Sequence, residues 1–362
     1  MGAHPSAPSG LERAGRHTTL DAVIAADPVN ELGAACADRF GGRLPFLLKV
    51  LAAEQALSIQ VHPSRQQAEA GFRAENERGQ AAGDKTRNYV DDWPKPEILC
   101  ALTPFEVLAG MRTATDAAAL LRGLEVTDLE PVATGLADAT GPEALTRALT
   151  HILTWPALGR AALVAEVTTA CGKLADGAGP YAAACAAAVR LAAEHPGDLG
   201  VAASLLLRHT VLQPGQAVFL PAGGLHSYLH GTGIELLANS DNVVRAGLTA
   251  KHIDVPELLR LTDPAVSVPV IAPRALGDGV SVYDSPAPEF RLYRAELGTG
   301  AVTLPGEGAR LVLCTEGTVT LRADGGALKA GRGESCFVSA ADGAVAAAGP
   351  AVIFLATSGL NE

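Results

Sequence analysis

Hydrophobic and polar residues alternate differently in three parts of the chain. Residues 1–113 mix strand-like runs with proline and glycine turns, and residues 210–362 return to valine, glycine and short alternating runs. Residues 114–209, between them, are rich in alanine and leucine at helical spacing, with Leu145 and Leu149 four residues apart. The pattern predicts a mainly β protein that contains a helical insertion.

Two short segments of the last part follow one order of residues. In residues 215–222 a glycine precedes an apolar run that ends in Pro-Ala, and residues 333–340 repeat this order with Ser-Ala. Four residues further on, the first segment has His226 and the second has Ala344. This echo predicts two β units of similar design, of which the first alone carries a ligand. A chance match of short apolar runs is the alternative.

A third pattern combines strand periodicity with polar chemistry in residues 57–62. The aliphatic residues at odd positions form one face, and the other face carries Ser58, Gln60 and His62. A glutamine and a histidine two residues apart can direct an amide oxygen and an imidazole nitrogen to one point, which suits a metal ion. The alternative is a polar row that faces solvent.

The tripeptide Lys95-Pro96-Glu97 stands directly before an apolar run. Because the residue before a proline avoids the helical region, we expect an extended segment with Lys95 and Glu97 on one face. The alternative is an ordinary surface ion pair.

Residues 221–254 gather polar side chains among glycine turns. Glu235 lies between two aliphatic residues, which favours an inward-facing carboxylate in an apolar strand. Arg245 follows a polar loop, a position suited to reaching a ligand. The candidate residues of this stretch are His226, Tyr228, Glu235, Asp241 and Arg245.

Composition and charge exclude several classes of function. The chain has 28 Lys and Arg against 39 Asp and Glu, a net charge of -11, so its overall field disfavours nucleic acid and anionic membranes but allows a small phosphorylated ligand. A hydrophobic content of 48% excludes disorder as the main state. There is no apolar run of about 18 residues and no signal pattern at the start, which predicts a soluble, cytoplasmic protein. The six scattered cysteines predict reduced core thiols.

The motifs together resemble the type I zinc-dependent phosphomannose isomerases, also called mannose-6-phosphate isomerases. The matching blocks are LPFLLKVL, LSIQVHP, KPE, GGLHSYL and SDNVVRAGLTAKHID, and SIQVHP combined with SDNVVRAGLT is highly specific. The resemblance covers most of residues 1–260, weakens across the helical part and is loose in the last hundred residues. Members of this family have some tens of residues before the segment that here begins MGAHPSAPS, so the resemblance implies that this chain lacks the family's N-terminal segment and its early strand.

The resemblance implies two cupin-like (jelly-roll) β-sandwich units, with an α-helical domain inserted in the first. We expect a catalytic domain in two parts, a helical insertion domain and a C-terminal domain without metal ligands. Their ranges are 1–113 and 210–275 for the catalytic domain, 114–209 for the insertion and 276–362 for the C-terminal domain.

The resemblance also implies one Zn²⁺ per chain. Two imidazoles, one carboxylate and one neutral amide would leave a site of net charge about +1 with room for a water or a substrate oxygen. The implied ligands are Gln60, His62, Glu97 and His226.

The implied reaction interconverts mannose 6-phosphate and fructose 6-phosphate through a zinc-assisted cis-enediol proton transfer. Lys95 or Glu235 would act as the base, and Arg245 as a catalytic cation. The substrate-binding residues would be Lys49 and Ser58 for the phosphate, with Tyr228 and Asp241 shaping the pocket. We expect a monomer whose partner is the small phosphosugar.

Three alternatives compete with this hypothesis. A cupin-type metal oxygenase gathers His-x-His and a glutamate in one short motif, whereas here Glu97 lies 35 residues after His62. A non-catalytic sugar-binding cupin would be favoured if ligands had been lost, but all four are present. A related isomerase for a different phosphosugar stays open.

Overall fold

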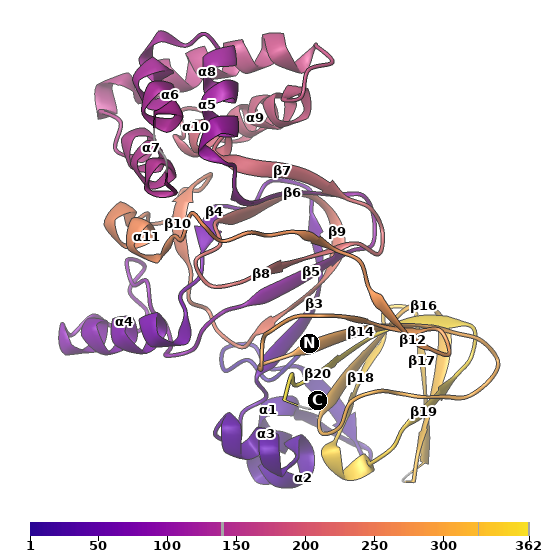
Figure 1. Ribbon diagram of the computed structural model, residues 1–362. Coiled ribbons are helices and arrows are strands. Elements are labelled where there is room, and N and C mark those ends of the chain that lie inside the picture. The colour runs from indigo at the N-terminus through magenta and orange to yellow at the C-terminus, as the bar shows by residue number, and fades with distance from the viewer. Residues whose placement is uncertain (139–140, 325, 361–362) are drawn as a thin grey trace.

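The computed structural model describes residues 1–138, 141–324 and 326–360. Across these residues the strands form two nine-stranded sheets and one two-stranded hairpin, and the larger group of helices stands at one end (Figure 1). This is the mainly β fold with a helical segment that the pattern predicts. Within the described ranges, no helix combines the length and the apolar character needed to cross a membrane.

The N-terminal sheet carries most of the candidate site residues. Its strands are β3 (Phe46–Ala53), β4 (Ile59–Val61), β5 (Glu97–Ala101), β6 (Phe105–Met111), β7 (Leu207–Leu212), β8 (Ala217–Leu220), β9 (His226–Ala238), β10 (Val244–Gly247) and β11 (Val270–Ile271).

Strand β9 curls this sheet because its two halves pair with different neighbours. The half that begins at His226 pairs with β4 and β6, and the other half pairs with β3 and β5. At Gly231 φ is 132°, and a Cβ there would lie 2.8 Å from the Cα of Phe105, so this position requires glycine. Side chains of strands that pair with either half, such as Leu99 of β5 and Val107 of β6, meet in one buried cluster, and the sheet therefore encloses an interior.

Helices from the middle of the chain cover the outer face of β4. They are α5 (Ala114–Gly123), α6 (Glu130–Ala137), α7 (Glu143–Leu153), α8 (Arg160–Ala175), α9 (Ala182–Glu194) and α10 (Gly200–Ser204). Ile59 and Val61 of β4 are fully buried in one cluster with side chains of α5 to α10. Because side chains alternate along a strand, this packing turns Gln60 to the interior.

The polar row at residues 57–62 was predicted as one strand, and the observed β4 is shorter. The main-chain N–H of Leu57 still donates to the oxygen of Tyr228, at 2.8 Å. The predicted alternation of side-chain faces therefore holds around Gln60 and His62, although the strand is shorter.

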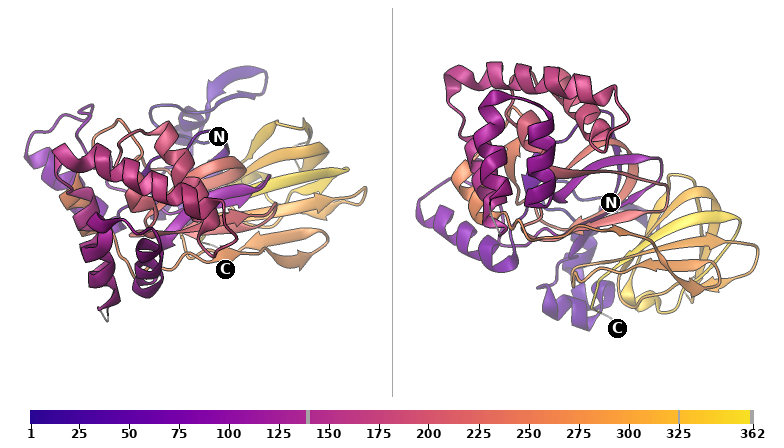
Figure 2. Two further views of the ribbon diagram at one scale, coloured as in Figure 1. Left: turned by 90° about the horizontal axis from the view of Figure 1, so that it is seen from above. Right: turned by 45° about the horizontal axis from the view of Figure 1, so that its top comes forward.

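The C-terminal sheet encloses an apolar interior. Strand β16 is its longest and pairs with four others, β17 to β20. The strands are β12 (Arg274–Gly277), β13 (Val280–Tyr283), β14 (Arg291–Leu297), β15 (Val302–Thr303), β16 (Arg310–Ala323), β17 (Gly326–Gly331), β18 (Ser335–Val338), β19 (Ala346–Ala348) and β20 (Ala351–Thr357). Figure 2 shows this sheet and the helices α5 to α10 at opposite ends of the molecule.

The echo between the two sheets extends to backbone conformation. Gly215 and Gly333 have φ values of 85° and 83°, and each precedes a short strand, β8 or β18. His226 then begins β9, whereas Ala344 lies two residues before β19.

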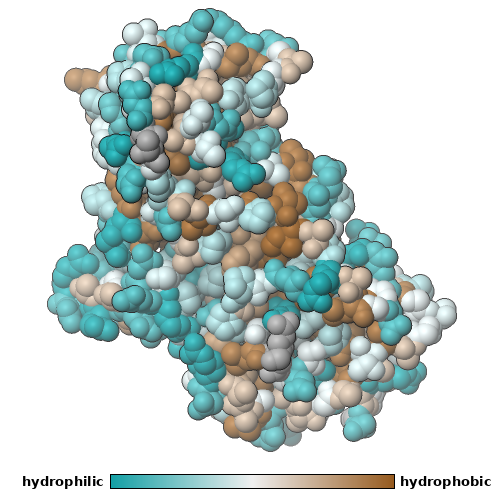
Figure 3. Space-filling view, in the orientation of Figure 1, coloured by the Kyte–Doolittle hydropathy of each residue, from teal (hydrophilic) through white to brown (hydrophobic). Residues whose placement is uncertain are grey.

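The remaining elements flank the sheets. They are the hairpin β1 (Gly10–Arg13) and β2 (Arg16–Thr19), and the helices α1 (Leu20–Ala26), α2 (Pro28–Leu32), α3 (Ala34–Arg39), α4 (Arg65–Glu77) and α11 (Val255–Leu261). Helix α4 projects at one side of the molecule, where the surface is mostly hydrophilic, while hydrophobic residues gather toward the middle of the same face (Figure 3).

Candidate metal centre

In the curled N-terminal sheet, polar residues of three neighbouring strands form one row. Arg245 of β10 lies opposite Gln60 of β4, and Gln60 lies opposite His226 of β9. Residues that pair directly across a sheet point to the same face. His62 follows two residues after Gln60 and so belongs to this face as well.

Three buried side chains converge in the interior. Ligand atoms of His62, Glu97 and His226 all lie within 4.8 Å of one another, and each residue is at most 1% exposed. The Nε2 atoms of His62 and His226 lie 3.2 and 3.5 Å from the two carboxylate oxygens of Glu97. The amide of Gln60 completes the group, with Nε2 at 3.3 Å from Nε2 of His226, and a half-turn of the amide brings Oε1 to that place.

Main-chain carbonyls fix which nitrogen of each imidazole carries the proton. Nδ1 of His62 donates to the oxygen of Asn242 at 2.8 Å, and Nδ1 of His226 donates to the oxygen of Gly224 at 2.9 Å. A carbonyl can only accept, so in the neutral ring the lone pair is on Nε2, which faces Glu97.

The donor set fits a divalent cation. Nε2 of His62 is buried, and despite its distance to Glu97 it has no hydrogen-bond partner among the described atoms. Two lone pairs and a carboxylate that face one another without protons between them repel, and a bound metal removes this cost. Two imidazoles and one carboxylate are also a set of three protein ligands that zinc takes in catalytic sites, and the amide oxygen of Gln60 would be a fourth donor.

The protonation states agree with this arrangement. Burial lowers the pKa of His62 to about 4, so the ring is neutral near pH 7. Burial alone would raise the pKa of Glu97, but the neighbouring His62, Lys95 and His226 outweigh it and hold that pKa well below its usual value. A neutral imidazole and an ionised carboxylate are the forms that bind a metal.

Two further polar groups contact Glu97. Nζ of Lys95 lies 3.5 Å from Oε1, which is the shared face predicted from the Lys-Pro-Glu segment. The hydroxyl of Tyr228 donates to Oε2 at 3.4 Å, and burial together with the charges of Glu97 and Glu235 raises the pKa of Tyr228 well above its usual value.

A second carboxylate lies beside the cluster on the same sheet. Glu235 is 4% exposed, pairs in register with Lys49 across β9 and β3, and its Oε2 lies 3.5 Å from Nζ of Lys49. Burial and the charge of Glu97 raise the pKa of Glu235, while Lys49 and Lys95 oppose that shift. The site therefore holds two carboxylates in unlike electrostatic surroundings.

The other candidate residues lie at the edge of this group. Arg245 is half-buried, and burial lowers its pKa. Ser58 is half-buried just before β4. Asp241 is exposed on the loop between β9 and β10, where its carboxylate lies 3.1 Å from Nε2 of His4 and not against the cluster.

Sequence reasoning missed the residues that support the centre from outside. Asn242 and Ser240 lie on the loop before β10, and both hydrogen-bond to Asp91, which lies about 150 residues earlier in the chain. The run of small polar residues before β10 was the available signal, but its partners are distant in sequence.

The chain is similar to phosphomannose isomerases in sequence and in structure. The family profile described as phosphomannose isomerase type I, catalytic domain, matches residues 1–114. The chain is 35% identical to the mannose-6-phosphate isomerase of Escherichia coli (strain K12) over 353 residues, which is 96% of this chain and 88% of that protein. It is 34% identical to that of Rattus norvegicus over 342 residues, which is 88% of this chain and 78% of that protein.

Two solved structures have the same architecture. A variant of phosphomannose isomerase from Salmonella typhimurium superposes with a TM-score of 0.92 at 32% identity, covering 99% of this chain and 90% of the other. The Salmonella typhimurium mannose 6-phosphate isomerase bound to fructose 6-phosphate and zinc has a TM-score of 0.89 at 33% identity, with the same coverage.

Proposed function

The chain belongs to the type I phosphomannose isomerase family, and on that premise we propose that it interconverts mannose 6-phosphate and fructose 6-phosphate. The observation that carries the proposal is the buried group of two histidines and a glutamate, with Lys95 against the same glutamate. The relative of known structure that holds fructose 6-phosphate and zinc supports the same reaction.

We propose that Zn²⁺ is the cofactor, one per chain, held by Gln60, His62, Glu97 and His226. The unpartnered Nε2 of His62 and the proton positions on both rings support this assignment. When bound, zinc supplies a Lewis acid beside the oxygens on which negative charge develops.

Isomerisation moves one proton between C2 and C1 of the open-chain sugar through a cis-enediol. We propose Lys95 or Glu235 as the group that takes and returns this proton, because Glu235 is buried beside the cluster and the half-buried Lys95 lies against Glu97. Arg245 would stabilise the negative charge of the enediolate or the phosphate, since it lies opposite Gln60 at the end of the polar row.

The remaining roles concern substrate binding. We propose that Lys49 and Ser58 hold the phosphate and that Tyr228 and Asp241 shape the pocket. The exposed side chain of Lys49, 44% accessible, supports its part, because a phosphate must be reached from solvent. The place of Asp241 directly before Asn242, whose main-chain oxygen accepts from His62, supports its part.

We further propose the finer organisation that the family implies. It comprises two cupin-like units with a helical domain inserted in the first, with the boundaries given above, acting as a cytoplasmic monomer. The curl of β9 and the parallel conformations at Gly215 and Gly333 support two related units. A different phosphosugar as the substrate is the remaining alternative.

An isomerase assay on the purified chain tests this function. Mannose 6-phosphate would be supplied and fructose 6-phosphate followed, before chelation, after chelation and with zinc restored. We expect turnover that chelation removes and zinc restores. If the folded, zinc-loaded protein leaves mannose 6-phosphate unchanged but converts another aldose phosphate, the assignment of the substrate is contradicted. If it converts no aldose phosphate, the assignment of isomerase activity is contradicted.

A further inference from the structure

We propose that Asn242 is a positioning residue of the metal centre, which couples the imidazole of His62 to the chain segment that leads into Glu97. The inference rests on the proposed zinc site and deepens it. Asn242 lies on the loop between β9 and β10 and is completely buried. No role in the reaction follows from its own chemistry, because a carboxamide neither transfers protons at neutral pH nor reaches the cluster.

The carboxamide of Asn242 is bonded to one short stretch of main chain. Its Oδ1 accepts the N–H groups of Val90 and Asp91, at 2.8 and 3.2 Å. Its Nδ2 donates to the main-chain oxygens of Asp91 and Trp93, both at 2.8 Å. Both the donor and the acceptor end of the amide are therefore used on residues 90–93.

The main-chain oxygen of the same residue holds His62. Nδ1 of His62 donates to this oxygen at 2.8 Å, and the loop cannot move it away without breaking the hydrogen bonds of the carboxamide to residues 91–93 and to the N–H of Val90. The proton is thereby kept on Nδ1, and Nε2 is left to bind the metal. Because residues 90–93 lead directly to Glu97, one residue sets the relative position of two ligands.

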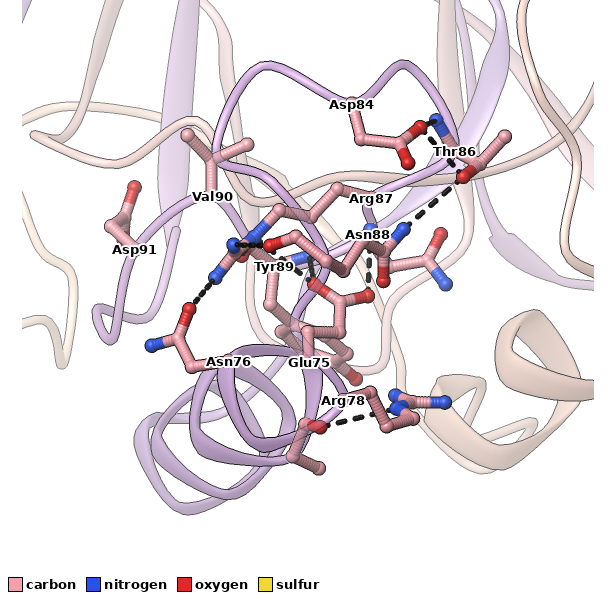
Figure 4. Close-up of polar contacts among 12 residues, drawn as sticks. Glu75, Asn76, Arg78, Asp84, Thr86, Arg87, Asn88, Tyr89, Val90 and Asp91 are labelled. Carbon is pink, nitrogen blue, oxygen red and sulfur yellow. Dashed lines mark hydrogen bonds and ion pairs between the residues drawn. The ribbon is translucent and has the colours of Figure 1, made fainter.

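The segment that leads into residues 90–93 is itself fixed from two sides, and Figure 4 shows the contacts on the side of α4. Glu75 of α4, 2% exposed, accepts the N–H groups of Asn88 and Tyr89 at 2.9 and 3.0 Å, and Nε of Arg87 lies 3.3 Å from its Oε2. Asp91 then accepts from the Ser240 hydroxyl at 2.8 Å on the loop side. A rigid partner of this kind is what a positioning contact needs.

The other histidine offers an internal comparison. Nδ1 of His226 donates to the oxygen of Gly224, in a turn that Asn242 does not contact. Asn239 offers a matched control variant, because it lies on the same loop but its Nδ2 donates to the oxygens of Ala3 and Leu44.

The test compares Asn242→Ala with Asn239→Ala in the full chain. Zinc affinity would be measured by competition with a chelator of known affinity, and the ring protons of His62 and His226 by two-bond ¹H–¹⁵N correlation in the zinc-free protein. We expect Asn242→Ala to weaken zinc binding about 10- to 100-fold, the usual loss for a residue that orients a ligand, and to shift part of the His62 population to the Nε2-protonated ring. His226 stays protonated on Nδ1, and Asn239→Ala keeps the zinc affinity of the unaltered chain.

Unaltered zinc affinity in Asn242→Ala, with His62 still protonated on Nδ1, would overturn the inference. An equal shift at His226 would also overturn it, since that result means general loosening. If circular dichroism shows that Asn242→Ala does not fold, Asp91→Asn replaces it, because Asp91 makes the same contact from the side of residues 90–93. We expect this variant to weaken zinc binding and to shift the His62 proton in the same direction, by smaller amounts. Neither readout depends on turnover, so a failure of the proposed isomerase activity would be seen separately.

Discussion

The two large sheets share turn conformations but differ in what they enclose. The interior of the N-terminal sheet holds His62, Glu97 and His226, and Glu235 lies beside them. The described interior of the C-terminal sheet is an apolar cluster that includes Val319 and Ile353, both fully buried. A similar backbone can therefore house either a polar centre or a plain core, and the chemistry lies in the few side chains that point inward.

The contrast also separates two sources of stability. Burial of apolar side chains stabilises the C-terminal sheet and needs no hydrogen bonds or cations inside the cluster. The polar interior of the N-terminal sheet is tolerated because hydrogen bonds fix the rings of His62 and His226 and cations lie near both Glu97 and Glu235. Substitutions should therefore affect function in one sheet and stability alone in the other.

The largest effect is expected for Glu97→Gln. The cluster loses its carboxylate, so we expect no measurable isomerase turnover and a loss of zinc affinity above the about 100-fold typical of residues that only orient ligands. Chelator competition and the isomerase assay measure the two effects. The matched control is Glu289→Gln, a buried carboxylate 3.3 Å from Arg65 and outside the cluster, which should keep zinc affinity. An equal loss of zinc affinity in both variants would contradict a specific role of Glu97 in binding the metal.

The next effect distinguishes the two candidate bases. Replacement of the true base, by Glu235→Gln or by Lys95→Met, should lower kcat by about 10²- to 10⁴-fold, the usual contribution of general base catalysis. The same variant should stop exchange of the C2 proton of mannose 6-phosphate with deuterated solvent, followed by NMR. The variant of the residue that is not the base should mainly change KM and should leave the exchange of the C2 proton largely intact. Full exchange in both variants would exclude both residues as the base.

A third prediction compares one isoleucine from each sheet. Ile353→Ala and Ile59→Ala should each lower the free energy of unfolding by about 2 to 5 kcal/mol, because both side chains are fully buried. Ile59 backs the polar row, so its variant should also weaken zinc binding, whereas Ile353→Ala should not. Denaturant titration and chelator competition measure the two quantities. Weaker zinc binding in Ile353→Ala would show that the two sheets are not independent.

The smallest effect concerns the contact between helix α9 and the N-terminal sheet. Glu106 lies 2.5 Å from His209 and Arg190, and although burial alone would raise its pKa, these partners lower it. A carboxylate with a depressed pKa contributes stability above its unfolded value near 4.5, and that contribution is lost as pH falls through the folded pKa.

Glu106→Gln should therefore lower the free energy of unfolding by about 1 to 3 kcal/mol at pH 7, and the difference from the unaltered chain should vanish in acid. Denaturant titrations between neutral and acid pH measure this. If the difference in free energy of unfolding grows as the pH falls, the pKa of Glu106 is not lowered by folding and the prediction is contradicted.

The sequence predicted those parts of the molecule whose causes are local. Alternation at Gln60 and His62 and the proline between Lys95 and Glu97 were enough to indicate shared faces, and the structure has Lys95 against Glu97. The position of Asn242 depends on contacts with residues 90–93, far away in the chain, and no local pattern reports them. The shorter β4 likewise reflects where the sheet curls, which the pairing of β9 decides.

Which residues bind the metal is the central claim, and X-ray absorption at the zinc edge of the zinc-loaded chain tests it most directly. The account predicts one zinc per chain with nitrogen and oxygen ligands alone, at about 2.0 to 2.2 Å, and the multiple scattering of two imidazoles. Sulfur at about 2.3 Å, or a spectrum without two imidazoles, would contradict it, because the six cysteines lie outside the cluster and His62 and His226 lie within it.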